Sequence, residues 1–291
     1  AGNIQFYYSD RKETPFDKCK DTPFGAVCGA KLDSIRLSYD AKINKIINLS
    51  YQYTGKRMML ASIYDSQKGH YALRYNNGPL VDPFTIDIDH WNYWSGAGSN
   101  KTLFPDMDYS QLKDWLEGPF TKYRSLNREA TGRDYDVFLL NEITYPTGGY
   151  TKYEYEPHDY ERYIAQDSPT YSLFLKGAIS GDQKGKLAGG ARLRRMTHYD
   201  GNSPAKTAFY QYTAEKRSKR SSGILLKRKP LYIYGIHAHE DPPSGYPIIS
   251  YRSDGHQEPA DYASNYIEYS RVFESQSEAK KSGMSILITH L

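Results

Sequence analysis

The sequence has few cysteines and no long apolar run. Cys19 and Cys28 are the only cysteines among 291 residues, and they lie in a loop rich in proline and glycine. So few thiols exclude a disulfide-dense scaffold, and they leave too few ligands for a zinc site. The two cysteines form either a disulfide, as in an exported protein, or two unpaired thiols. No stretch approaches the roughly 18 apolar residues of a membrane-spanning helix, so we expect no membrane span.

The sequence also lacks a charge bias and the usual nucleophile motifs. Its 38 basic and 34 acidic residues leave a net charge of +4, which is too small to favour a nucleic-acid partner. There is no G-x-S-x-G motif, and neither cysteine has a neighbouring base, so the chain does not resemble a serine or cysteine hydrolase. The pair Gly189–Gly190 is not followed by a helical pattern, which argues against a phosphate loop.

Tyrosine is the residue that the chain has in abundance. There are 29 tyrosines against 10 phenylalanines and 3 tryptophans, and only 38% of the residues are hydrophobic. Tyrosine favours strands and half-buried positions, where the ring packs and the hydroxyl group stays in water. The composition therefore predicts a mainly β protein with a thin aromatic core, as in a curved sheet or a shell.

The stretch Val137–Tyr155 reads as a β-hairpin that turns at Pro146–Gly149. The same pattern occurs at three places in the chain. Each unit has a leucine, then an isoleucine or methionine, then a glycine, and then two or three tyrosines. The units are Leu60, Ile63, Gly69, Tyr71 and Tyr75; Leu140, Ile143, Gly148, Tyr150, Tyr153 and Tyr155; and Leu193, Met196, Gly201, Tyr210 and Tyr212. The first two units have the same spacing from isoleucine to the last tyrosine. The third is longer by four residues, which predicts a longer turn there.

This repeated pattern resembles the YD-repeat (Rhs) family, and most closely the divergent YD-like large surface proteins of the Bacteroidota. Further blocks resemble that family too: Asp89–Gly96, Tyr145–Tyr150 running into Glu154–His158, Gly189–Leu193 and Tyr266–Val272. The resemblance implies antiparallel hairpin repeats in a curved sheet or partial shell, with no active site within the repeats. It also implies that residues 1–291 form a single YD-repeat-like region of a larger protein. Its partners would then be other domains of the same polypeptide.

Other segments complete the expected secondary structure. Residues 4–8, 32–39 and 43–53 read as strands, and the last two should pair antiparallel. Residues 108–130 read as one short helical insert, since Leu112, Trp115 and Leu116 follow a capping Asp108 or Ser110 at helical spacing. We expect an irregular insert over 157–188 and a single strand over 265–273.

Three polar clusters are candidates for chemistry, each with a plain structural alternative. His237 and His239 could chelate a metal from one face of a strand, but no third ligand is identifiable and the plain strand end is preferred. Glu154 and Glu156 share a strand face, as paired acids would, or are ordinary surface charges. The basic run 216–220 is expected to be a solvated loop, with a polyanion contact as the alternative.

The aromatic residues Trp91, Tyr93 and Trp94 form the most plausible ligand platform, because aromatic faces stack on sugars and cations. The alternative is that these rings pack in the core, where tryptophan is commonly buried. We predict no catalytic residue, no metal and no cofactor.

The sequence thus predicts a non-enzymatic structural module that scaffolds or encases another domain, outside the cell or on a bacterial surface. The alternative is a carbohydrate-binding β-module that uses the exposed aromatic residues on a surface glycan. An enzyme such as a glycosidase is a third reading, supported only by isolated carboxylates. Because Ala1–Ile4 opens directly on a strand-like segment without a signal peptide, we expect a mature or excised fragment.

Overall fold

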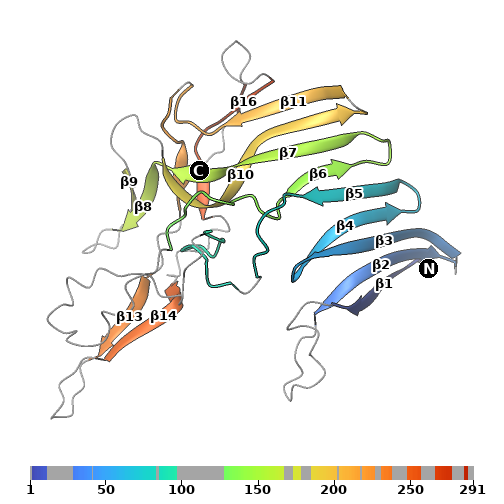
Figure 1. Cartoon of the computed structure of the whole chain (residues 1–291), viewed down its shortest axis with the longest axis horizontal. Helices are drawn as coiled ribbons and strands as arrows, with labels where there is room; N and C mark the ends of the chain where they lie inside the picture. The colour runs from blue at the N-terminus through green and yellow to red at the C-terminus, as the bar shows by residue number, and fades with distance from the viewer. Residues whose placement is uncertain are drawn as a thin grey trace. The chain divides into compact units, whose positions relative to one another are not determined.

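The described part of the chain folds almost entirely into β-strands (Figure 1). The computed structural model describes residues 2–11, 29–40, 42–82, 85–96, 128–166, 173–177, 185–201, 203–216, 218–226, 231–237, 248–256, 266–276 and 285–287. No helix occurs in these ranges, so none of them holds a helix able to span a membrane. The predicted helix over 108–130 lies outside the described residues, apart from 128–130, which are not helical.

Most strands belong to one large antiparallel sheet that is not closed on itself. Ten strands and a short eleventh, β17, lie side by side in the following order: β1 (Gly2–Asp10), β2 (Ala30–Tyr39), β3 (Lys42–Thr54), β4 (Arg57–Asp65), β5 (Gly69–Tyr75), β6 (Leu140–Thr144), β7 (Tyr150–Tyr160), β10 (Lys186–Asp200), β11 (Ser203–Gln211), β16 (Val272–Ser275) and β17 (Ser285–Leu287). The predictions of a mainly β fold and of antiparallel hairpins are therefore confirmed.

Two smaller sheets complete the structure. The first is mixed and contains β15 (Ile267–Tyr269), β12 (Gly223–Leu225), β8 (Arg162–Gln166) and β9 (Leu173–Gly177), in that order. In it, β12 runs parallel to β8 and antiparallel to β15. The second is the hairpin of β13 (Leu231–His237) and β14 (Ile248–His256).

By its internal contacts the chain divides into two compact units. Unit 1 comprises residues 1–84, 137–154 and 195–208, and unit 2 comprises residues 85–136, 155–194 and 209–291. Unit 1 contains β1–β6 and the hairpin ends of β7, β10 and β11. Unit 2 contains the two smaller sheets, β16, β17 and the other ends of those three strands.

The three predicted hairpins are present, and each turns at or beside its predicted glycine. Gly69, Gly148 and Gly201 have φ values of 98°, 87° and 65°, in the region that glycine adopts without strain. At the second turn, the N–H of Tyr145 donates to the carbonyl of Gly149. Gly149 does not have a positive φ, so backbone conformation does not explain why this position is a glycine. Space does, because a Cβ atom there would lie 2.8 Å from the carbonyl oxygen of Tyr199.

The prediction of a longer turn in the third repeat is wrong. β10 ends at Asp200 and β11 begins at Ser203, so the turn stays short. The four additional residues lengthen the two strands instead, because an antiparallel pair can extend in register without changing its turn.

Two other predictions need correction. Where the structure describes it, the segment 157–188 is not an irregular insert: β7 runs on to Tyr160, and β8 and β9 follow and pair with each other. Residues 265–273 are not one strand either, since β15 and β16 belong to different sheets. Between them Ser270 donates through its N–H and its hydroxyl group to the carbonyl of Ser222, and Ser222 Oγ donates to the carbonyl of Arg271. These side-chain bonds replace the ladder and divide the strand.

The buried apolar residues lie mostly in unit 2. Its core cluster contains Tyr160, Ala188, Leu225 and Ile267, and Trp91, Tyr163, Tyr266 and Tyr269 pack against it. Of the buried apolar residues of the described chain, only Ala208 belongs to unit 1. The core is thus small, as the composition predicts, but its fully buried residues are mostly aliphatic, and the aromatic rings pack around them at partly buried positions.

Candidate functional site

Three of the sequence blocks that carry the family resemblance meet within unit 2. Trp91 and Tyr93, from the first block, each place their ring centroid 5.4 Å from that of Tyr266, from the last block. The hydroxyl group of Tyr266 donates to the carbonyl oxygen of Gly189, in the third block. Segments more than seventy residues apart in the sequence therefore build one site.

Asp89 is the central carboxyl group of this site and is completely buried. Its Oδ1 accepts the N–H groups of Trp91 and Tyr93, at 2.8 and 2.9 Å, which fixes the loop that carries both rings. The buried guanidinium of Arg128 donates through Nη2 to the Asp89 carbonyl at 2.6 Å. The other carboxyl oxygen, Oδ2, has no hydrogen-bond partner within the part of the chain that the structure describes.

Burial raises the pKa of Asp89 to about 6, although the two N–H donors and the charge of Arg128 act in the opposite direction. The carboxyl group therefore changes charge in the mildly acidic range. It is inaccessible to solvent, so its protons are not available to a substrate.

The glycine pair in β10 accommodates Asp89 and Tyr93. A Cβ atom on Gly189 would overlap Asp89 Oδ2, and one on Gly190 would lie 2.8 Å from the Tyr93 ring. Gly190 also has a φ of 73°, which a larger residue rarely adopts. The pair is needed for close packing between the strand and this loop, which agrees with the rejection of a phosphate loop.

The three aromatic residues predicted as a ligand platform have different surroundings. Trp91 is half-buried against the core cluster. Trp94 is also half-buried, and its backbone forms an isolated bridge with Ile88. Tyr93 is the exposed member, with 42% of its surface accessible. The residues lie on one loop, and of the three only Tyr93 is classed as exposed.

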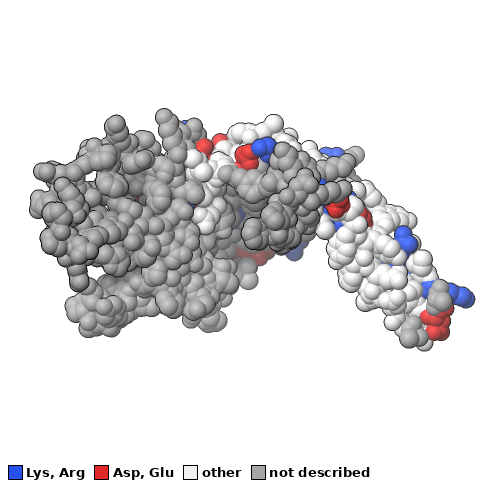
Figure 2. Space-filling model, turned by 90° about the horizontal axis from the view of Figure 1, so that it is seen from below, with Lys and Arg blue, Asp and Glu red and all other residues white. Residues whose placement is uncertain are grey.

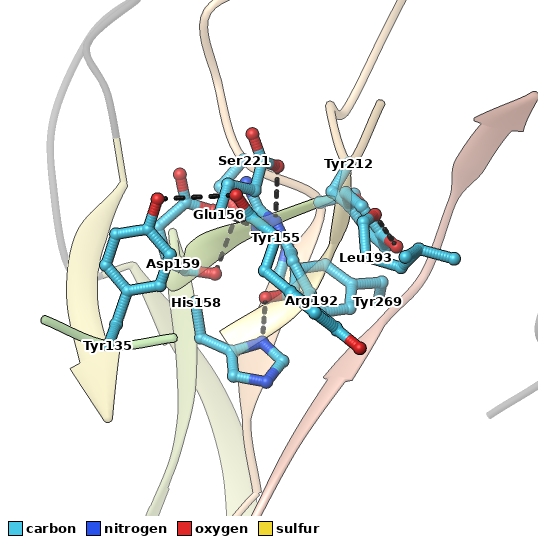
Figure 3. Close-up of polar contacts among 12 residues, drawn as sticks. Tyr135, Tyr155, Glu156, His158, Asp159, Arg192, Leu193, Tyr212, Ser221 and Tyr269 are labelled. Atoms are coloured by element: carbon cyan, nitrogen blue, oxygen red, sulfur yellow. Dashed lines mark hydrogen bonds and ion pairs between the residues drawn. The ribbon is translucent and has the colours of Figure 1, made fainter. Parts of the chain in front are cut away.

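A second polar network in unit 2 is centred on Arg192 (Figure 3). Its Nε lies 2.6 Å from Glu156 Oε1, and its Nη1 lies 2.6 Å from Asp159 Oδ1. The guanidinium carbon also lies 4.5 Å from the ring centroid of Tyr212 and 4.9 Å from that of Tyr269. Burial alone would lower the pKa of Arg192, but Tyr269 and the two carboxylates raise it above its usual value. The cation is permanently charged and is paired with two carboxylates.

His158 lies beside this cation. Its Nδ1 is 2.7 Å from the hydroxyl oxygen of Tyr269, and the two rings are stacked with an interplanar angle of 17°. Burial and the neighbouring charge of Arg192 lower the pKa of His158 to about 4, so the imidazole is neutral near pH 7. Burial also raises the pKa of Tyr269 to about 12.

Three of the acidic and basic residues that the sequence singles out each have an oppositely charged partner elsewhere in the chain. Glu154 accepts a hydrogen bond from Arg195 Nε at 2.7 Å, and Glu156 is held by Arg192, so each acid has its own arginine. In the basic run, Arg220 Nε donates to the nearly buried Glu161 at 2.9 Å. Lys216, Lys219 and Arg220 are nevertheless exposed, so the described basic residues of the run lie at the surface as predicted. Glu154 and Glu156 are each engaged by an arginine, as surface charges on a strand commonly are.

The histidine pair can be examined only in part. His237 ends β13, and His239 lies outside the described residues. Across the described ranges, no three histidine, cysteine, aspartate or glutamate side chains are grouped so that they could hold a metal ion. The two cysteines likewise lie outside the described residues.

One kind of hydrogen bond recurs in three hairpins of the large sheet, and it was not predicted. The hydroxyl group of the last tyrosine donates to the backbone carbonyl of the first leucine: Tyr75 to Leu60 at 2.8 Å and Tyr212 to Leu193 at 2.7 Å. Tyr51 donates to Leu32 in the same way at 2.6 Å. We call these three bonds the tyrosine–leucine clamps.

The third clamp reveals a repeat unit that the sequence reasoning missed. Leu32-Asp-Ser-Ile35 has the same leucine–isoleucine spacing as the other units, and Asp40 lies eight residues after Leu32, as the turn residue Gly201 lies eight residues after Leu193. Asp40 has a φ of 49°, in the region that the turn glycines occupy elsewhere. The missing glycine concealed the unit, whereas the leucine–isoleucine spacing could have revealed it.

No protein-family model matches the chain, and no curated protein matches it either. The site must therefore be interpreted from its own chemistry. Its buried charges are paired, its neutral histidine is packed between aromatic rings, and its buried carboxyl group holds backbone amides. Such an arrangement fixes loops and strands in place.

Proposed function

We propose that this chain is a non-enzymatic structural module of a secreted or cell-surface bacterial protein of the YD-repeat type. It scaffolds or encases another domain of the same larger polypeptide, in a curved sheet or partial shell of hairpins. Its partners are neighbouring domains, and it needs no cofactor.

The repetition of the tyrosine–leucine clamps is the observation that carries the proposal. Each clamp ties a tyrosine near the end of a unit to the first leucine of that unit, so the unit is held together by residues of its own motif. Repeating units of this kind extend a sheet without requiring a catalytic centre, as in other repeat proteins. Burial raises the pKa of Tyr51 and of Tyr75, which is consistent with hydroxyl groups that serve packing.

The way in which the buried charged groups are paired also supports a structural role rather than a catalytic one. Arg192 on β10 is paired with Asp159 and Glu156 on the neighbouring β7, so this buried cation serves to join two strands. A catalytic acid or base would need access to a substrate, and Asp89 has none.

The location is tested with antibodies raised against the purified chain. We expect them to label intact source cells or their medium, and protease treatment of intact cells to remove the surface signal. A signal that appears only after lysis would contradict the proposal.

The scaffolding role is tested by limited proteolysis of the natural polypeptide. We expect the neighbouring domain to be cleaved slowly, and faster when Tyr51, Tyr75 and Tyr212 are all changed to phenylalanine. The matched control is Tyr64→Phe, at a ring that is 47% exposed. Equal cleavage in all variants would argue against an encasing role.

Binding of a surface glycan is the second candidate, and the exposed Tyr93 ring favours it. A glycan array probed with the chain and with Tyr93→Ala and Trp94→Ala separates the two functions. Specific binding that is lost in Tyr93→Ala, with an unchanged melting temperature, would support the binding module. The absence of binding to any glycan would leave the structural role as the better account.

A further inference from the structure

The dipeptide Asn77–Gly78 lies just beyond the end of β5. Asn77 is the only asparagine of the chain that is followed directly by glycine. An asparagine side chain can react with the backbone nitrogen of the next residue, and glycine hinders that reaction least because it has no Cβ atom and a permissive backbone. The dipeptide is therefore the position of this sequence where such a reaction is chemically easiest.

The structure leaves both reacting groups accessible. Asn77 and Gly78 are exposed and belong to no strand. Within the part of the chain that the structure describes, neither the N–H of Gly78 nor the side chain of Asn77 has a hydrogen-bond partner. A hydrogen bond to that N–H would hold the nitrogen away from the neighbouring amide carbon. The attacking nitrogen and the carbon that it attacks are thus adjacent, unpaired and open to water.

The preceding asparagine is held in place, in contrast to Asn77. The N–H of Asn76 donates to the carbonyl of Leu139 at 2.9 Å, and its Oδ1 accepts a hydrogen bond from Asn141 Nδ2 at 2.9 Å. Further along, Asp82 forms an ion pair with Lys56 at 2.7 Å. The reactive dipeptide therefore lies in a short exposed segment that is anchored on both sides.

Packing requires glycine at position 78. A Cβ atom there would lie 2.3 Å from Cγ2 and 2.9 Å from Cγ1 of Val137. The φ of Gly78 is not in the positive region, so space rather than backbone conformation excludes a larger residue. The contact with Val137 therefore keeps the least hindered neighbour next to Asn77.

We propose that Asn77 is a modification site, at which the chain deamidates spontaneously through a cyclic imide. The backbone nitrogen of Gly78 attacks Cγ of Asn77, so a new C–N bond forms and the Cγ–Nδ2 bond breaks. The proton of the attacking N–H passes through water to the leaving nitrogen, which departs as ammonia. Water then adds to one of the two imide carbonyls and opens the ring, which leaves either an aspartate or an isoaspartate.

The reaction changes both the charge and the backbone of the anchored segment. Each modified chain gains one carboxylate, so its net charge falls by one from +4. The isoaspartate product also has one additional carbon in its main chain, next to the close contact between Gly78 and Val137. The described surface in Figure 2 is mostly uncharged, so an added carboxylate changes the local charge substantially, and cation exchange should separate modified from unmodified chains.

The test follows the purified whole chain by mass spectrometry of its tryptic peptides during incubation at mildly alkaline pH. We expect the peptide that contains Asn77 to gain the mass difference between a hydroxyl group and an amino group, and to separate into two products of equal mass. One of the products should be methylated by an isoaspartate methyltransferase. The peptide that contains Asn141, whose side chain is hydrogen-bonded, should not change.

Asn77→Gln is the matched variant, because glutamine keeps the amide but would have to form a larger ring. It should keep the melting temperature of the unaltered chain and show no mass change in that peptide. A sample unfolded in guanidinium chloride measures the reaction without the fold, and we expect the folded chain to react at a comparable rate. An unmodified folded chain, or a mass change that persists in Asn77→Gln, would overturn the proposal.

Discussion

A single hydroxyl group closes each clamp, so the clamps can be tested one atom at a time. Tyr51→Phe, Tyr75→Phe and Tyr212→Phe each remove one hydrogen bond to a leucine carbonyl. We expect each to lower the free energy of unfolding by about 0.5–1.5 kcal/mol in denaturant titrations. Tyr64→Phe, at an exposed ring, should change it by less than about 0.5 kcal/mol. Equal effects at all four positions would show that the clamps contribute nothing specific.

Asp89 should make stability fall as the pH rises from about 4 to about 6. Its pKa is 3.8 as an ordinary carboxyl group and about 6 in the fold, so the folded protein holds the proton more tightly. The resulting stabilisation is complete below pH 4 and is lost as the pH passes 6. We therefore expect Asp89→Asn to be more stable than the unaltered chain at pH 7, by about 1–3 kcal/mol.

The variant Asp89→Ala separates the effect of the carboxylate charge on stability from the effect of the hydrogen bonds that this carboxyl group accepts. It removes the acceptor for the N–H groups of Trp91 and Tyr93, so stability should be lost at pH 4 and at pH 7. Thermal melts at the two pH values measure both variants. If Asp89→Asn were less stable at pH 7 and unchanged at pH 4, the carboxyl group would not be the source of the pH dependence.

His158 should act in the opposite direction over nearly the same range. Its pKa falls from 6.5 to about 4 in the fold, so unfolding takes up a proton between these values. Its contribution is present above pH 6.5 and is lost as the pH falls towards 4. In His158→Phe we expect stability to decline less between pH 6.5 and 4, by about 1–3 kcal/mol. A decline as steep as that of the unaltered chain, measured by urea titration, would contradict this role.

At the scale of the elements, the turn glycines should differ in how strongly they resist substitution. Gly69 and Gly201 both have positive φ, but a Cβ atom on Gly69 would lie 2.8 Å from Cβ of Pro146, whereas one on Gly201 meets nothing within 4 Å. Gly201→Ala should therefore cost about 1 kcal/mol, from backbone strain alone. Gly69→Ala should cost more, and Lys216→Ala, at an exposed position, should cost less than about 0.5 kcal/mol. Thermal melts give the order, and a reversal of the two glycines would refute the packing argument.

Some elements could be predicted from the sequence because the relevant signals are local. The three hairpins follow from leucine, glycine and tyrosine spacing, and the pairing of β2 with β3 follows from alternation. The fourth repeat was missed because Asp40 replaces glycine at its turn. The break between β15 and β16 depends on Ser222, which lies far away in the sequence.

The candidate site could be predicted only in its parts. The blocks containing Trp91, Gly189 and Tyr266 are visible in the sequence, but nothing local shows that they meet. The same holds for Arg192, whose partners lie 33 and 36 residues away on another strand. Pairing between distant strands depends on sheet order, which a periodic pattern does not determine.

At the scale of the whole molecule, the buried apolar residues are unevenly distributed. Ile224 in unit 2 is fully buried, whereas Ile43 in unit 1 is 56% exposed. Ile224→Ala should lower the free energy of unfolding by about 2–5 kcal/mol, because it removes buried methyl groups and leaves a cavity. Ile43→Ala should lower it by less than about 0.5 kcal/mol. If denaturant titration gave similar losses for Ile224→Ala and Ile43→Ala, the core of the molecule would not lie around the buried residues of unit 2.

The tyrosine–leucine clamp has a consequence for how such a chain can evolve. The acceptor is a backbone carbonyl, which every amino acid provides, whereas the donor is a phenol, which only tyrosine provides. Substitutions at Leu32, Leu60 or Leu193 can keep the bond if the new side chain suits the strand, but substitutions at the tyrosines cannot. Divergent copies of this unit would therefore retain tyrosine spacing after the leucines have changed, and a search for distant relatives should weight the tyrosines.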